Sequence, residues 1–154
     1  MAPTGAADAS EQAGPAEPGR AIIGASWAGN VAFAITAVPV ALGVDAIDDA
    51  SIAVALFLFF VSLPVWTWAM ITAFARTARG DDVVVTTWFL LEGEVPTRAR
   101  WLLYGSLGVC LLITVATAAA NPFGVLVPMY PLGLIGLWGA RHGVYPPRRN
   151  DRPR

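Results

Sequence analysis

The chain contains no lysine, one cysteine and one histidine, and each of these shortages excludes a class of chemistry. Without lysine, the chain cannot form a P-loop phosphate site or a Schiff base. The single His142 excludes a multi-histidine metal centre, and the single Cys110 excludes an internal disulfide and a CxxC redox pair. We therefore expect no metal ion and no cofactor.

Charged residues are also scarce, at 14% of 154 residues, against about 25% in an ordinary soluble domain. Hydrophobic residues make up 56% of the chain, and the formal net charge is -1, which gives no basic field for nucleic-acid binding. A soluble chain of this length needs a large polar surface. The composition therefore predicts an integral membrane protein, partnered by the lipid bilayer. All ten basic residues are arginine, and this bias is typical of a high-GC bacterial gene.

Four uncharged apolar segments predict four transmembrane helices, and hence an all-α fold. They cover residues 22–43, 51–75, 101–119 and 123–140. At about 1.5 Å per residue, each is close to or longer than a hydrocarbon core of about 30 Å. They are apolar on every side, which is typical of membrane spans. Asn121-Pro122 separates the last two segments, because proline disfavours helix at its own position and at the preceding residue.

The pieces outside these spans predict no soluble domain, because each is shorter than the roughly 40 residues that an independent core needs. Residues 1–21 are expected to be a disordered cytoplasmic tail, and residues 141–154 a basic cytoplasmic tail. Four crossings place all ten arginines on one side, opposite a first loop that carries Asp45, Asp48 and Asp49. The positive-inside rule then predicts a multi-pass protein of the plasma or inner membrane with both termini in the cytoplasm.

Small residues indicate where the helices approach one another, since close backbone contact drives association in lipid. In the first span, a stripe of small residues recurs every four positions: Gly24, Ala28, Ala32 and Thr36. The fourth span carries glycines every three positions: Gly133, Gly136 and Gly139. We expect both sets to serve contacts within the bundle in preference to self-association.

A layer of polar and aromatic side chains is expected in the half of the bundle nearest the cytoplasm, about 10–15 Å deep by helix rise. Its candidate members are Asn30, Trp66, Thr67, Trp68 and Tyr130. Buried amide, indole and phenol groups seek hydrogen-bond partners. The layer would then either line a pocket open to the cytoplasm or hold the helices together.

Segment 76–100 combines terminal arginines, acidic residues and short apolar runs, and it is the most distinctive stretch outside the spans. We expect it to lie on the interface or to dock a partner. The residues that would do so are Arg76, Arg79, Asp81, Asp82, Trp88, Arg98 and Arg100. The alternative is a tethering loop whose apolar side packs on the bundle.

The spans contain no histidine, aspartate or glutamate to activate a nucleophile or to carry a proton. We therefore expect a non-enzymatic accessory or interaction protein that binds another membrane protein or a second copy of itself. The alternative is an oligomeric transporter or channel for a neutral or apolar solute, built around a fourth helix broken by Pro128 and Pro131. A membrane enzyme that uses the carboxylates of segment 76–100 is a third possibility.

Overall fold

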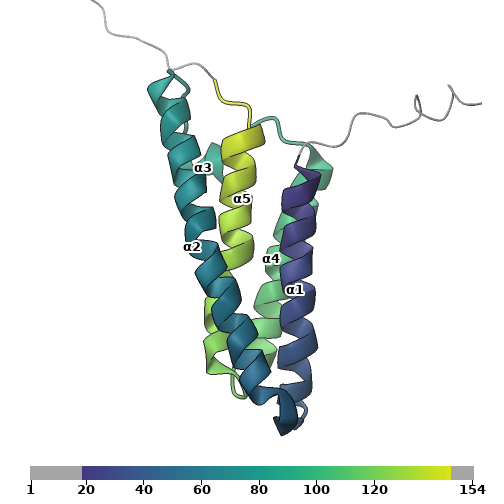
Figure 1. Cartoon of the computed structure of the whole chain (residues 1–154). Coiled ribbons are helices and arrows are strands. Elements are labelled where there is room, and N and C mark those ends of the chain that lie inside the picture. The colour runs from purple at the N-terminus through teal and green to yellow at the C-terminus, as the bar shows by residue number, and fades with distance from the viewer. Residues whose placement is uncertain (1–18, 147–154) are drawn as a thin grey trace, which may run out of the picture.

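The computed structural model describes residues 19–146, which form a bundle of long helices (Figure 1). Most of the two expected tails therefore lies outside the described residues. The elements in chain order are α1 (Arg20–Ala41), η1 (Asp45–Ile47), α2 (Asp48–Ala78), α3 (Val85–Trp88), α4 (Thr97–Thr117), η2 (Pro122–Leu126) and α5 (Met129–His142).

The expected all-α fold with four apolar membrane spans is confirmed. Four helical segments are long and apolar enough to cross a bilayer: Arg20–Ala41, Asp45–Ala78, Thr97–Thr117 and Pro122–His142. Helix α2 has 31 residues, which at about 1.5 Å per residue exceeds a hydrocarbon core of about 30 Å. Its polar ends therefore extend beyond the lipid core.

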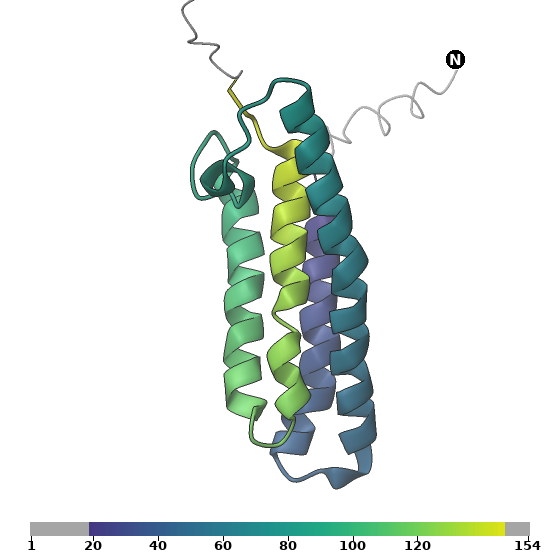
Figure 2. The ribbon, with the colours of Figure 1, turned by 90° about the vertical axis from the view of Figure 1, so that its left-hand side faces the viewer.

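Helix α5 is the central element, although it comes last in the chain. In two perpendicular views it lies between α2 and α4, with α1 alongside (Figures 1 and 2). In the apolar stretch of the fourth span, 56% of the residues are buried in the bundle. The corresponding shares for the first three spans, in chain order, are 33%, 22% and 28%. The core of the bundle is thus built around this one helix, and Trp138 and Ile135 are among its fully buried side chains.

The fourth span is broken between η2 and α5, where Pro128 and Pro131 remove two backbone donors. The carbonyl of Gly124 instead accepts from the amide of Val127 at 3.1 Å and from the hydroxyl of Thr114 on α4 at 3.4 Å. The carbonyl of Val127 accepts from the amide of Tyr130 at 2.9 Å. These local and interhelical bonds satisfy the freed carbonyls, as membrane burial requires.

The predicted contact face of the first helix is wrong. Gly24, Ala28 and Ala32 are exposed on the outside of the bundle. The inward face instead carries the large side chains of Ile22, Ile23, Phe33 and Val40, and between them the smaller or polar residues Ser26, Gly29, Asn30 and Ala37. Burying large residues fills the space between helices and leaves the small ones on the surface.

The arginines gather at one end of the bundle, where the loop between α2 and α4 also carries Asp81, Asp82, Glu92 and Glu94. The arginines of the described segment sit at or beside the helix ends that meet at the top of Figure 1: Arg20, Arg76, Arg79, Arg98, Arg100 and Arg141. Asp45, Asp48 and Asp49 lie in and after η1 at the other end. We refer below to the first end as the arginine end.

Candidate functional site

The expected polar layer divides into an inner and an outer group. Asn30 is 2% exposed, and its amide nitrogen donates to the carbonyl of Ser106 at 2.6 Å and to the Ser106 hydroxyl at 2.9 Å. The hydroxyls of Ser26 and Ser106 are 2.7 Å apart. This cluster of hydrogen bonds joins α1 to α4, and interhelical hydrogen bonds of this kind hold membrane helices together.

Tyr130 and Trp66 anchor α5 to its neighbours. The Tyr130 hydroxyl donates to the carbonyl of Ala25 at 3.1 Å, and its ring lies where a Cβ on Gly29 would stand. The Trp66 indole donates to the carbonyl of Met129 at 3.0 Å and lies over Gly133 in the same way. Glycine therefore provides the room for each aromatic ring.

Thr67 and Trp68 belong to the outer group. The Thr67 hydroxyl bonds only to its own helix, at the carbonyl of Leu63. Trp68 is 58% exposed, and the Arg141 guanidinium lies 5.7 Å from the centre of its ring, within the range of a cation–π contact. The structure thus brings Asn30, Trp66 and Tyr130 into the packed bundle, and it turns the other two outward.

The loop between α2 and α4 packs on the bundle through its apolar centre. The Trp88 indole donates to the carbonyl of Gly136 at 2.8 Å, and the Tyr104 hydroxyl donates to the carbonyl of Phe89. A Cβ on Gly139 would overlap the Trp88 carbonyl, so only glycine permits this approach. Leu90 is fully buried and adopts a φ of 59°, a conformation that is uncommon for residues other than glycine.

Arg76, on α2, hydrogen-bonds to the C-terminal end of α5. Its guanidinium donates to the carbonyl of Gly143 at 2.6 Å and to that of Arg141 at 3.1 Å. It also lies 5.1 Å from the centre of the Tyr145 ring. A cation at a helix C-terminus is favourable because it meets the unpaired carbonyls there.

The other candidate residues of segment 76–100 lie near the surface. Arg79, Asp82 and Arg98 are exposed, and Asp81 is half-buried. The Asp82 amide donates to the carbonyl of Pro146 at 2.9 Å, which joins the loop to the segment after α5. Arg100 differs from these four, because its side chain enters a hollow.

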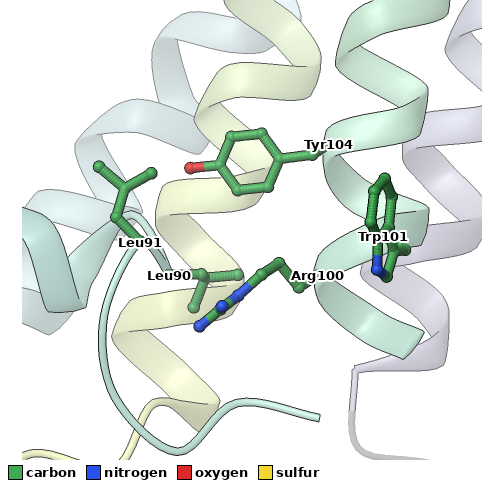
Figure 3. Close-up of a pocket in the computed structure, with 5 residues that line it drawn as sticks. All are labelled: Leu90, Leu91, Arg100, Trp101 and Tyr104. Carbon is green, nitrogen blue, oxygen red and sulfur yellow. The ribbon is translucent and has the colours of Figure 1, made fainter. Parts of the chain in front are cut away.

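The hollow lies between the loop and the first turns of α4, at the arginine end (Figure 3). It has a volume of about 250 Å³, and its walls are Leu90, Leu91, Arg100, Trp101 and Tyr104. The walls are almost wholly apolar apart from the guanidinium. The Arg100 Nε is buried without a hydrogen-bond partner, and the described segment provides no acidic group paired with Arg100. Leu91 and Trp101 are 59% and 74% exposed and form the rim.

Tyr145 ties the segment after α5 back onto that helix by a hydrogen bond that depends on its phenol proton. Burial raises the pKa of Tyr145, the Arg76 guanidinium lowers it and Asp81 raises it again, with burial the largest of the three effects. The Tyr145 hydroxyl donates to the carbonyl of Gly139 at 2.8 Å, and the phenolate cannot. Because the pKa is raised by folding, this stabilisation is complete below the ordinary phenol pKa of about 10 and is lost as the pH rises through the folded value. Ultraviolet absorbance should be followed through a pH titration of the wild type and of Tyr145→Phe. The difference between the two curves should show one phenol that ionises above its ordinary pKa of about 10.

Several residues of these sites were not predicted from the sequence, among them Ser26, Ser106, Leu90, Leu91, Trp101, Tyr104 and Tyr145. Trp101 and Tyr104 are recognisable only as interfacial aromatics. The serines lie among other small residues, so nothing distinguishes a bridging hydroxyl before the helix facing is known. No family model, no curated protein and no solved structure matches the chain.

Proposed function

We propose that this chain is a non-enzymatic accessory protein of the cell membrane, and that it acts by binding another membrane component at the hollow beside Arg100. The observation that carries the proposal is a preformed apolar hollow with an unpaired guanidinium in its wall. The guanidinium makes no hydrogen bond to an acceptor in the described segment, so its terminal nitrogens are left to bind an acceptor from another molecule. The exposed Leu91 and Trp101 place apolar surface at its mouth.

Binding is better supported than transport of a neutral solute. Transport needs a path past the Asn30 and Tyr130 level, and there both side chains hydrogen-bond to neighbouring helices. The hollow at Arg100 and a second one lined by Pro64, Thr67, Trp68 and Ile71 contain neither residue. The polar groups of the inner half therefore support packing.

Purification from native membranes in a mild detergent tests this role. We expect the wild type to retain a component in a fixed ratio and Trp101→Ala to lose it, as measured by quantitative mass spectrometry of proteins and lipids. Phe57→Ala is the matched control, because Phe57 is 65% exposed on α2, far from the hollow. Equal retention by all three chains would contradict the proposal.

We further propose that the arginine end faces the cytoplasm. The separation of arginines from Asp45, Asp48 and Asp49 supports this orientation, since short arginine-rich loops stay inside. Reporter fusions at both termini should then be active only with a cytoplasmic reporter, and an insertion after Asn121 only with an external one. Termini in different compartments would contradict the orientation.

A further inference from the structure

We propose that the component held at Arg100 is an anionic phospholipid of the cytoplasmic leaflet, with its phosphate on the guanidinium and part of an acyl chain along Leu91 and Trp101. The inference rests on the proposed function and names the partner of the same site. It follows from the charge, the lining and the position of the hollow, taken in turn below.

The charge of the site selects an anion. Among the described residues, Arg100 is the one charged residue in the walls of the hollow, and its guanidinium makes no hydrogen bond within residues 19–146. A guanidinium presents a planar fork that matches the oxygens of a phosphate, and such charge-assisted bonds are among the strongest that a side chain makes. Arg76 differs in this respect, because its guanidinium already bonds to the carbonyls of Gly143 and Arg141.

The lining of the site selects an amphiphile. Apart from the guanidinium, the hollow offers apolar surface from two leucines and two aromatic rings. The Tyr104 hydroxyl is already bonded to the Phe89 carbonyl, so it adds no free donor. A volume of about 250 Å³ is smaller than the roughly 300–1,000 Å³ of pockets that enclose a whole ligand. The hollow therefore fits part of a larger molecule whose remainder lies outside.

The position of the site selects a lipid. Arg100 and Trp101 lie in the first two turns of α4, where the span meets the arginine end (Figure 3). An arginine at such a level meets the headgroups, and an amphipathic ring such as that of Trp101 reaches from the headgroups to the first carbons of the acyl chains. A phospholipid in the leaflet presents phosphate and hydrocarbon in this order without leaving the membrane.

The test uses the full chain, purified in a mild detergent and supplied with equal amounts of phosphatidylglycerol and phosphatidylcholine. We expect native mass spectrometry to show about fivefold preferential retention of phosphatidylglycerol, the ratio that corresponds to about 1 kcal/mol for one arginine near an anionic surface. In Arg100→Gln this preference should disappear. Arg79→Gln is the matched control, since Arg79 is an exposed cation at the same end with its Nε on the carbonyl of Ala75.

Two further measurements complete the test. One asks whether the headgroup phosphate binds without acyl chains, and the other asks whether a substitution changes folding or only lipid binding. sn-Glycerol 3-phosphate, which carries the phosphate without acyl chains, should not displace the lipid. Because Arg100 makes no side-chain hydrogen bond within the described segment, Arg100→Gln should melt at the wild-type temperature. Leu91→Ser provides a second variant, because Leu91 is exposed and its change should weaken retention of both lipids.

Each contrary result has a distinct meaning. Equal retention of the two lipids by the wild type, or the same loss in Arg79→Gln, would overturn the lipid assignment. A protein that co-purifies one to one and is lost in Trp101→Ala would overturn the lipid and leave the accessory role standing. A wild-type chain that retains neither lipid nor protein would overturn both.

Discussion

Gly139→Leu is expected to release the loop from α5 and to lower the free energy of unfolding by about 3 kcal/mol, the upper end of the range for overpacking. A Cβ at this position overlaps the Trp88 carbonyl, which is backbone and cannot rotate away. The loop must then lift, which exposes Leu90 and separates Trp88 from Gly136. Thermal unfolding in detergent measures the stability, and trypsin cleavage after Arg79 and Arg98 measures the release.

The control is Gly105→Leu on α4, because no atom lies within 4 Å of a Cβ built there. An open glycine within a helix gains about 0.8–1.0 kcal/mol on replacement by a good helix former. Gly105→Leu should therefore leave trypsin cleavage unchanged and keep or raise the melting temperature. Equal damage from both substitutions would show that the loop contact is not the cause.

Asn30→Asp is expected to lower the free energy of unfolding by about 2.5–3.5 kcal/mol, the cost of an aspartate at the centre of a membrane helix. The side chain keeps its shape but loses the donor that serves the carbonyl and the hydroxyl of Ser106. An ionised carboxylate beside that carbonyl is repelled, so the loss should be greater at pH 8 than at pH 4. Unfolding in a denaturing detergent at the two pH values measures the difference.

A double-mutant cycle of Asn30→Ala and Ser106→Ala isolates the bond between the Asn30 amide and the Ser106 hydroxyl, because the Ser106 carbonyl is kept in every variant. We expect a coupling of about 0.6–1.7 kcal/mol, the range found for hydrogen bonds between membrane helices. Thr67→Val is the matched control, because the Thr67 hydroxyl bonds only within its own helix. A coupling near zero would show that this hydroxyl bond does not hold α1 to α4, and that the bond to the Ser106 carbonyl and side-chain packing do so instead.

The number of spans and their limits could be predicted, because uncharged runs report directly on the thickness of the lipid core. The span expected at 22–43 corresponds to Arg20–Ala41, and the one expected at 101–119 to Thr97–Thr117. The differences lie at the ends, where arginines join the helices. Long side chains of this kind place their charge at the interface while their backbone remains helical.

The facing of each helix could not be predicted. A span that is apolar on every side has no polar face to tell inside from outside. The stripe at Gly24 and Ala28 was therefore assigned to the bundle interior and in fact lies outside. Asn30 and Tyr130 face inward while Thr67 and Trp68 face outward, although all four share one expected depth. Depth follows from residue number, but rotation about the helix axis follows from packing.

The candidate site shows the same division. Arg100 and Trp88 belong to the segment that the sequence analysis selected, but Trp88 holds the loop down and Arg100 opens into the hollow. The loop packs on α5 at Gly136 and Gly139. Both glycines were predicted as contact points, and both are buried. Their partners could not be identified, because a loop has no periodicity from which its docking can be derived.

The central place of α5 bears on biosynthesis. A ribosome delivers the chain from its N-terminus, so α1, α2 and α4 enter the bilayer before the helix on which they assemble. Until α5 arrives, Trp66 lacks the Met129 carbonyl and Trp88 lacks the Gly136 carbonyl. Before α5 is inserted, the nascent protein can join α1 to α4 through Asn30 and Ser106, but the contacts of α2 and of the loop with α5 form only afterwards. A premature stop codon before Met129 would leave an inserted fragment for membrane proteases to remove.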